Sequence, residues 1–272
     1  MVESVRVQEK SSEWYEQWSM FKAPDRLLLE QWIAPATLED FRRKDVLECG
    51  CGAGQHTNFI APFATSITAV DLNTADIARA ENRHLLNATF IEADIASMDL
   101  GRQFDIVICI GVIQHTQNPD ATFRSIYKHC KSGGKIIIWA YSFEGNELVR
   151  WFVEPMRALL LRHLSRKALV VLSHLFTLVM LPFVYTVYRF KWARHFPYFE
   201  YFENFRKLSY HRNMLNVFDK LNAPSTVFFT RQHCETWFNE RLFEKESIHV
   251  RWHAGVSYSL SGIKKPDFKS EP

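Results

Sequence analysis

The sequence predicts an open α/β fold, with a mostly parallel β-sheet covered by helices on both faces. Short apolar runs typical of strands alternate with helix-like segments from residue 45 to residue 141. Parallel strands need such crossover connections, because the chain must return to the same end of the sheet. One run, residues 104–110 (FDIVICI), is apolar at nearly every position, which is typical of a strand buried on both faces.

Each element follows from local signals. The first strand begins at 45–47, and the helix that starts at 55–60 should stop before Pro62, since the residue before a proline is displaced from helical geometry. Asn73 or Thr74 can cap the next helix, which runs to about His84. Further strands are expected at residues 66–70, 88–91, 104–110 and 135–141.

The helix before the fifth strand has a clear beginning. Asn118 is a good N-cap, and Pro119 suits the first helical position because its missing N–H would have no partner there. The run Ser132-Gly133-Gly134 should close this helix.

Composition is that of an ordinary globular protein of 272 residues, with 47% hydrophobic and 23% charged residues. A net charge of +3 is too small to indicate nucleic-acid binding unless the charges cluster. The five cysteines favour reduced, buried thiols over a disulfide framework, and the first fourteen residues contain no apolar leader. We therefore expect a cytoplasmic protein.

Residues 46–54 read VLECGCGAG, a strand that ends in a glycine-rich turn. A dinucleotide-binding fingerprint would need a third glycine at position 55, which is Gln55, and the Gly-Lys-Ser/Thr of a phosphate-cradling loop is absent. The turn permits close approach of a ligand to the backbone, and Glu48 is placed to accept a hydrogen bond from an ammonium group. A purely structural turn is the alternative.

Two acidic residues follow neighbouring strands. Asp71 ends the second strand, where a carboxylate can bind both hydroxyls of a ribose, and Asp94 ends the third, within reach of an adenine amino group. Taken singly, each is also compatible with a surface acid or a helix cap. Because parallel strands end at one edge of the sheet, their alignment with the glycine turn favours a single nucleoside ligand.

These motifs resemble those of class I S-adenosylmethionine-dependent methyltransferases. VLECGCGAG, AVDLN, EAD, FDIVICIGVIQHTQNP and KSGGKIIIWAYS are similar to the successive family motifs, and the fourth-strand loop resembles the GVLHHT-like loop of small-molecule and lipid-pathway enzymes. The likeness covers about 40–142 and resumes at 219–265, first as a late helix and then as an antiparallel hairpin. It implies a Rossmann-like sheet of seven strands, mostly parallel with an antiparallel last strand, and S-adenosylmethionine as cofactor.

The resemblance also implies roles for individual residues. Glu48 stands where Asp is commoner, and Gln114 replaces the first His of the usual pair. The implied cofactor-binding residues are Glu48, Gly50, Gly52 and Gly54 around the methionine part, Asp71 at the ribose, Asp94 with Ile95 at the adenine, Ile110 and Gly111 along the groove that presents the methyl group, and the adjacent Cys51 and Leu72.

His115 is the candidate catalytic base. It follows the fourth strand, in the loop that should face the acceptor. If the acceptor atom is a hydroxyl oxygen, a base near neutral pKa would contribute to the rate. The alternative is that His115 packs or forms hydrogen bonds that hold the loop.

Residues 143–215 form an insertion beyond the minimal fold. They include 16 aromatic residues in 73 positions, and 11 Lys/Arg against 5 Asp/Glu. Their central run, 168–188, has 21 residues without a formal charge other than His174, which is long enough to span a membrane. A single crossing would separate two parts of one sheet, and Pro182 is expected to break a helix there.

The insertion therefore has two leading interpretations. It is either a buried helical lid over the active site or a peripheral element in the membrane interface, with aromatic residues at headgroup depth and Lys/Arg against anionic lipid. Both favour a bulky or lipid-linked acceptor. RNA is disfavoured, because the basic residues flank apolar runs and form no stripe. The N-terminal residues Trp14 and Trp18 lie one helical turn apart, in a segment that either covers the cofactor, as the resemblance implies, or packs in the core.

We expect an N-terminal helical lid segment at 1–40, a cofactor-binding core at 41–142 and 216–265, the helical insertion at 143–215 and a tail at 266–272. No metal site is expected, since His249, Arg251 and His253 on one strand face offer too few ligands. The predicted function is methyl transfer to a small-molecule or lipid-like acceptor, with oxygen favoured. The alternatives are a non-catalytic protein of this fold whose apolar insertion is an interaction surface, and aminopropyl transfer, for which an expected acidic motif is missing.

Overall fold

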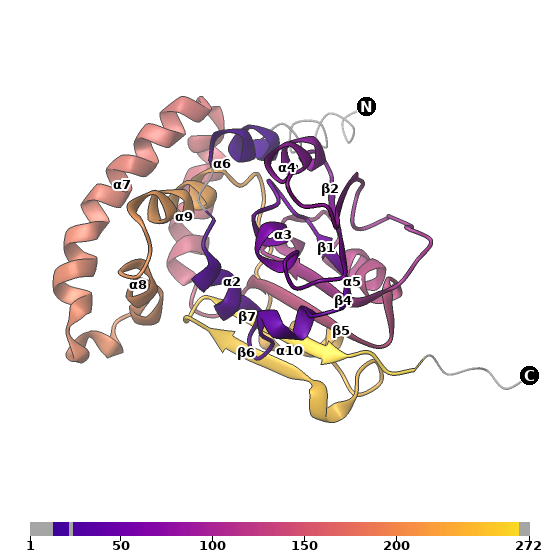
Figure 1. Cartoon of the computed structure of the whole chain (residues 1–272). Helices are drawn as coiled ribbons and strands as arrows, with labels where there is room; N and C mark the ends of the chain where they lie inside the picture. The colour runs from indigo at the N-terminus through magenta and orange to yellow at the C-terminus, as the bar shows by residue number, and fades with distance from the viewer. Residues whose placement is uncertain (1–12, 22–23, 267–272) are drawn as a thin grey trace, which may run out of the picture.

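The computed structural model describes residues 13–21 and 24–266, which contain a seven-stranded sheet of order β3-β2-β1-β4-β5-β7-β6 (Figure 1). Neighbours among the first five strands pair in parallel, whereas β7 is antiparallel to both β5 and β6. This arrangement confirms the predicted sheet. The strands are β1 Asp45–Cys49, β2 Ser66–Asp71, β3 Ala88–Glu92, β4 Phe104–Ile110, β5 Cys130–Tyr141, β6 His249–His253 and β7 Ser257–Ile263.

The sheet is buried on both faces, as its sequence predicts. Along β4, Val107 and Cys109 join one apolar cluster with α5 (Pro119–Lys128) and α10 (Arg231–Trp237). Ile106, Ile108 and Ile110 join a second cluster, which includes α2 (Arg26–Ile33) and α3 (Gln55–Ile60). Alternate residues of a strand point to opposite faces, so an unbroken apolar run supplies both cores. All five cysteines are buried and free.

The order of the strands reverses between β1 and β4. The chain moves outward from β1 to β2 and β3, then returns to place β4 on the other side of β1. Helices that connect strands on either side of such a switch point diverge, and they leave a crevice beyond the carboxyl ends of the strands. The glycine turn after β1 lies at this point.

The starts of the helices agree closely with local signals, whereas α4 and α5 end earlier than expected. Asn118 Oδ1 accepts a hydrogen bond from Ala121 N at 2.9 Å and caps α5, with Pro119 at the first helical position. The helix after β2 is α4 (Ala75–Glu81), which follows Thr74. The expected closure of α5 at Ser132–Gly134 is wrong, because Cys130 already pairs with Phe104 and β5 begins with an irregular register there.

The late region differs from the single helix that the resemblance implied. The helix α9 (Tyr210–Asn222) ends before Pro224, and an extended stretch separates it from α10. α9 also crosses the predicted boundary between residues 215 and 216, so the insertion and the core share this helix. The hairpin of β6 and β7 at the sheet edge is as expected. The division into segments otherwise stays a prediction.

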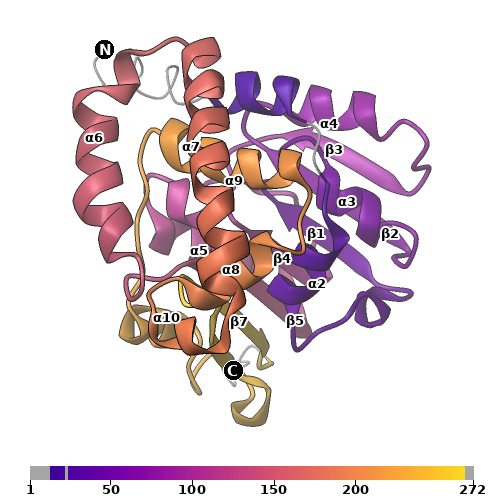
Figure 2. The ribbon, with the colours of Figure 1, turned by 90° about the vertical axis from the view of Figure 1, so that its left-hand side faces the viewer.

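The insertion is helical and has an apolar cluster of its own. Its elements are η3 Val149–Val153, α6 Glu154–Leu159, η4 Leu161–His163, α7 Arg166–Thr186, η5 Val187–Arg189, η6 Lys191–His195, α8 Phe199–Phe205 and the start of α9. Leu169 and Val184 of α7 pack with Leu215 and Phe218 of α9 in this cluster. Helix α7 lies at the outer edge of the molecule, on the far side of α9 from the sheet (Figures 1 and 2).

The expectation that Pro182 breaks the apolar run is wrong, since α7 is one helix of 21 residues. Pro182 is exposed, as is Leu178 four residues earlier, so the carbonyl that loses its helical partner lies on the solvent side. Thr186 Oγ1 donates to the carbonyl of Pro182 at 2.6 Å and supports the last turn.

The two ends of the helical excursion meet at the sheet. Ser142, which directly follows β5, forms a parallel bridge with Phe229. Phe143 N donates to Phe229 O at 2.8 Å, and Phe229 N donates to Tyr141 O at 3.0 Å. The chain therefore leaves and rejoins the core at one place.

Candidate active site

A cavity of about 620 Å³ lies beyond the carboxyl ends of the strands, within the usual range for small-molecule sites. The strand ends form one wall, and helices of the insertion form the opposite wall. Most of the residues that the sequence singled out lie together on its surface: Gly50, Cys51, Gly52, Asp71, Leu72, Asp94, Ile95, Ile110, Gly111 and His115.

The glycine turn requires glycine for a geometric reason. Gly50 and Gly52 have φ angles of +81° and +54°, in the left-handed region that other residues rarely adopt. A Cβ at Gly50 would lie 2.5 Å from the side chain of Val112, and one at Gly52 would lie 2.7 Å from the indole of Trp18. Because the turn has no side chains at these positions, Val112 and Trp18 pack closely against its backbone, which also lines the cavity.

Asp71 is held at the tip of β2 by backbone donors. Gly52 N donates to Asp71 Oδ2 at 2.9 Å, and Asn73 N donates to Oδ1 at 3.2 Å. Burial raises the pKa of this carboxyl, and the hydrogen bonds from Gly52 and Asn73 partly offset the effect. The carboxylate is thus joined to the glycine turn and still opens into the cavity.

Asp94 follows β3 on the same wall. Its Oδ1 accepts a hydrogen bond from Ala96 N at 2.9 Å, and the buried Ile95 lies beside it. Gly111 follows β4 with a φ angle of +76°, and its N–H donates to Trp139 O at 2.9 Å. The register of three strands therefore fixes this wall.

Glu48 and Gly54 are absent from the cavity surface in the described part of the chain. Glu48 is only 1% exposed; Thr57 Oγ1 donates to its Oε2 at 2.5 Å, and His56 Nδ1 lies 3.6 Å from its Oε1. That Oε1 has no hydrogen-bond partner among the described residues, and His56 itself lines the cavity. Gly54 serves as the N-cap of α3. Contact of Glu48 with an ammonium group stays a prediction.

His115 lies in the short helix η2 (Ile113–His115), on the cavity wall. Its Nδ1 is 2.9 Å from Ser225 O, and because a carbonyl only accepts, Nδ1 carries the proton and Nε2 keeps a lone pair in the neutral ring. The ring packs against Trp14 with centroids 4.9 Å apart, and edge-on to Tyr141 at 6.2 Å. By contrast Gln114 is buried and does not line the cavity.

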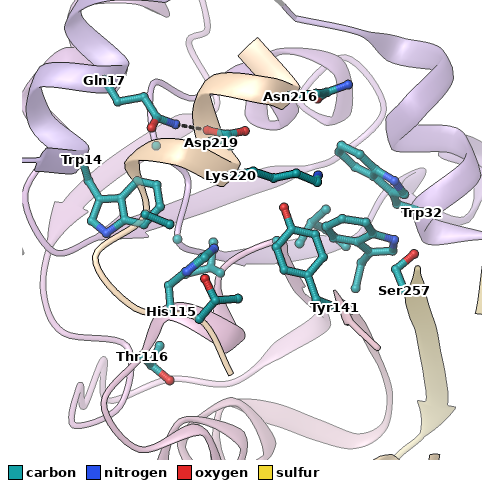
Figure 3. Close-up of a pocket in the computed structure, with 18 of the residues that line it drawn as sticks. Trp14, Gln17, Trp32, His115, Thr116, Tyr141, Asn216, Asp219, Lys220 and Ser257 are labelled. Atoms are coloured by element: carbon teal, nitrogen blue, oxygen red, sulfur yellow. Dashed lines mark hydrogen bonds between the residues drawn. The ribbon is translucent and has the colours of Figure 1, made fainter. Parts of the chain in front are cut away.

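The N-terminal segment closes one side of the cavity. Residues 13–20 are helical, and Trp14, Gln17 and Trp18 all face the cavity. Gln17 Nε2 donates to Asp219 of α9, while Asn222 Nδ2 donates to Gln17 Oε1 at 3.0 Å (Figure 3). This segment therefore connects the strand-end wall to the insertion wall.

The wall formed by the insertion contains charged and phenolic groups that the sequence analysis did not single out. They are Arg157 on α6, Tyr201 on α8, Arg212, Asp219 and Lys220 on α9, with Tyr141 at the end of β5. Burial raises the pKa of Asp219, an effect that Arg212 opposes, and burial lowers the pKa of Arg212. Positions 212, 216, 219 and 220 recur at helical spacing, and this polar stripe beside the apolar residues Leu215, Phe218 and Leu221 was the available signal.

No group of three possible metal ligands was found among residues 13–21 and 24–266. His253 of the late strand lines the cavity instead of facing only solvent. Burial lowers its pKa to about 4, with Arg251 adding to the effect, so it is neutral at pH 7.

Comparison with known proteins shows similarity in the part of the chain that forms the strand ends. Residues 46–134 match a family described as "Methyltransferase domain". Among curated proteins, a ubiquinone biosynthesis O-methyltransferase of Pseudomonas putida is 27% identical over 130 residues. That alignment covers 45% of this chain and 55% of the relative, so the chain spans about half the length of the curated relatives it matches.

Solved structures with partial likeness include two complexes with S-adenosyl-L-homocysteine (SAH). The N-methyltransferase NodS from Bradyrhizobium japonicum, in complex with S-adenosyl-L-homocysteine, has 18% identity, covers 51% of this chain and 78% of its own, and gives a TM-score of 0.41. A DhpI–SAH complex has 26% identity, covers 49% and 69%, and also gives 0.41.

The cavity suits a sulfonium nucleoside. A backbone without side chains stands beside a carboxylate at the β2 tip, and a second carboxylate follows β3, all on one surface. The matched residues 46–134 contain the glycine turn and both carboxylates. Residues 46–134, which supply the strand-end wall, therefore match a methyltransferase domain, and S-adenosylmethionine is the cofactor that this wall suits.

Proposed function

We propose that the protein transfers the methyl group of S-adenosylmethionine to a small-molecule or lipid-like acceptor with an apolar body, most readily at a hydroxyl oxygen. The observation that carries this proposal is the single cavity that joins Asp71, Asp94 and His115 to aromatic walls. The printed name of the curated relatives, O-methyltransferase, supports oxygen as the acceptor atom.

In the half of the cavity at the strand ends, groups of the protein would bind and orient the cofactor. The turn at Gly50 and Gly52 would approach the methionine part, with Cys51 beside it. Asp71, held by two backbone N–H groups, would accept hydrogen bonds from the ribose hydroxyls, and Asp94 with Ile95 would contact the adenine. Leu72 lies exposed beside Asp71, so it would cover the nucleoside by apolar contact.

In the acceptor half, His115 would take a proton. Its Nδ1–H is held by Ser225 O, which fixes the ring and leaves Nε2 as the basic atom. The acceptor hydroxyl would give its proton to Nε2 as its oxygen forms the new bond to carbon. Such a base contributes roughly 10²–10⁴ in rate.

The bound cofactor supplies an already activated methyl group, so alignment of the acceptor is the main requirement on the protein. Orientation of two reactants within one cavity corresponds to effective concentrations of about 10⁵–10⁸ M in favourable cases. The aromatic residues Trp14, Trp32 and Tyr141 line the cavity and would exclude water from the reacting atoms.

Calorimetry with S-adenosylhomocysteine, followed by a conversion assay, tests this function. We expect the full chain to bind the compound and to convert S-adenosylmethionine when mixed with a lipid extract or a soluble metabolite pool. Binding without conversion in either pool would favour the rival, a non-catalytic protein of this fold. No binding at all would contradict the proposal.

We also propose that the acceptor is lipid-linked and that α7 contacts the cytoplasmic face of a membrane. By length and composition, Arg166–Arg189 is long and apolar enough to cross a membrane. One of its faces is exposed and apolar, with Val171 at 59%, Val179 at 63% and Phe183 at 59% exposure. Its residues are absent from the described cavity wall, which favours an interfacial position over a lid.

The ends of α7 support the same proposal. Lys167, Arg189 and Lys191 are exposed, while Arg166 is paired with Glu13 and Glu16 at 2.5 and 3.1 Å. Phe190 and Trp192 add exposed aromatic surface beside the basic residues. Aromatic rings with cations around an apolar face are typical of peripheral contact with anionic lipid.

Liposome flotation tests the membrane contact. Deleting residues 168–188 would remove Leu169 and Val184 from the insertion's core, so a triple variant Val171→Ser, Val179→Ser, Phe183→Ser is the better probe. We expect the wild type to float with vesicles of phosphatidylcholine and phosphatidylglycerol, and the triple variant to stay in solution. Leu86→Ser, at a 99% exposed site far from α7 in sequence, is the control. Equal flotation of wild type and triple variant would contradict the contact.

A further inference from the structure

Three basic side chains among the described residues line the acceptor half of the cavity, and they differ in their carboxylate partners. Arg157 forms an ion pair with Glu154, and Arg212 faces the field of Asp219. Lys220, the third cation, forms neither an ion pair nor a side-chain hydrogen bond within residues 13–21 and 24–266. Asp219 interacts electrostatically with both Arg212 and Lys220, and Asp25 is a second carboxylate that acts on Arg212.

Aromatic faces hold this ammonium group in place. Lys220 Nζ lies 5.0 Å from the ring centre of Tyr201 and 5.6 Å from that of Tyr141. Ring faces stabilise a cation but accept few hydrogen bonds, so the three N–H donors of the ammonium can still bind an anion. All three side chains line the cavity, and they come from α9, α8 and the end of β5.

The two tyrosines add donors of their own. Neither hydroxyl forms a hydrogen bond among the described residues, and the hydroxyl of Tyr141 points toward α9, from which Lys220 extends (Figure 3). Burial raises the pKa of both Tyr141 and Tyr201, so each hydroxyl keeps its proton at neutral pH and donates.

We propose that Lys220, Tyr141 and Tyr201 form a carboxylate-binding subsite, and that the acceptor is an apolar molecule that carries a carboxylate. This inference rests on the proposed function and names the substrate class of the same cavity. An ammonium and two phenol O–H groups that line one cavity match the lone pairs of a carboxylate. A partly buried ammonium without an ion pair gains more from a carboxylate than from a neutral group, which gives the subsite its selectivity against neutral molecules.

The test is a calorimetric comparison of octanoate with 1-octanol, two probes of equal chain length, each titrated with and without S-adenosylhomocysteine. We expect octanoate to bind the wild type at least tenfold more tightly than octanol. Lys220→Met should lower octanoate affinity at least tenfold and change octanol affinity less than twofold. Lys220→Arg should keep most of the preference. Lys207→Met, an exposed site before α9 with the same change of charge, should behave as the wild type.

The variants Tyr141→Phe and Tyr201→Phe remove one hydroxyl each with little change of shape, and each should lower octanoate affinity by a few-fold. They keep the test valid if Lys220→Met does not fold. Equal binding of octanoate and octanol by the wild type, or octanoate binding that is insensitive to Lys220, would overturn the subsite. If the protein binds S-adenosylhomocysteine but shows no preference for octanoate, only the subsite is contradicted. If octanoate binds in a Lys220-dependent way but S-adenosylhomocysteine does not bind, only the methyl-transfer proposal is contradicted.

Discussion

The two walls of the cavity differ in how their polar groups are satisfied. At the strand ends, Asp71 and Asp94 accept hydrogen bonds from backbone N–H groups whose positions the sheet fixes. On the insertion side, Arg212, Asp219 and Lys220 depend on one another and on aromatic faces. The carboxylates of the first wall already have hydrogen-bond donors, whereas Lys220 of the second wall forms no ion pair among the described residues. We therefore expect the first wall to bind the cofactor and the second wall to select the acceptor.

The same contrast holds for apolar groups. Apolar residues of β4 are buried on both sides of the sheet, but α7 buries only one side and exposes the other. The apolar surface of β4 therefore serves the core alone, whereas α7 has a second apolar side that stays exposed, the side proposed above to contact a membrane.

The largest expected effect concerns His115, which lies between the two walls. His115→Ala should lower kcat by about 10²–10⁴-fold, because the acceptor hydroxyl loses its base, while S-adenosylhomocysteine affinity changes little. Conversion rates with the active extract fraction and calorimetry give the two values. Unchanged turnover would assign His115 to packing with Trp14 and Tyr141.

A second change tests the strand-end wall alone. Asp71→Ala should lower the affinity for S-adenosylhomocysteine about a hundredfold, since hydrogen bonds to a charged group contribute roughly 1.5–3 kcal/mol each. Glu92→Ala is the matched control, because Glu92 pairs with Asp71 in register but is exposed and outside the cavity. Equal affinities of the two variants would show that Asp71 does not bind the cofactor.

The two sides of α7 can be compared directly. Leu169 is 1% exposed and Leu175 is 55% exposed on the same helix. Leu169→Ala should lower the free energy of unfolding by about 2–5 kcal/mol, whereas Leu175→Ala should change it by less than about 0.5 kcal/mol. Urea denaturation measures both. Similar losses would mean that the outward side is also covered in solution, for example by a second protein.

The smallest effect is a pH dependence of cofactor binding. Burial raises the pKa of Asp71, so the carboxyl gains its proton at a higher pH than an exposed Asp does. A protonated carboxyl accepts fewer hydrogen bonds from ribose, so affinity should fall as pH is lowered through this raised pKa. Calorimetry across pH detects the fall, and Asp71→Ala should lose that pH dependence. A wild-type profile that is flat down to the usual range of an exposed Asp would contradict the assignment.

The sequence predicts the strand-end wall well because its signals are local. The cap at Asn118, the glycines after β1 and the apolar run of β4 each specify an element without reference to distant residues. Because neighbouring parallel strands end at one edge of the sheet, Asp71 and Asp94 then lie on the same side of the cavity.

The opposite wall depends on tertiary packing that no local pattern specifies. Whether Lys220 faces a cavity or solvent is decided by how α9 packs against α7 and the N-terminal segment. Pro182 shows the same limit. A proline inside a helix is expected to break it, but at this exposed position the helix α7 continues through the proline.

The meeting of Ser142 with Phe229 has a further consequence. Both ends of the segment 143–228 are hydrogen-bonded to each other at the end of β5. The segment is therefore a loop whose end points stay in place whatever its length. Lengthening such a loop costs little free energy, and its content can be exchanged without shifting the register of the sheet. Under the proposed function, the excursion could therefore be exchanged for that of another protein of this fold and would bring Lys220 and Tyr201 with it, while Tyr141 stays in the core.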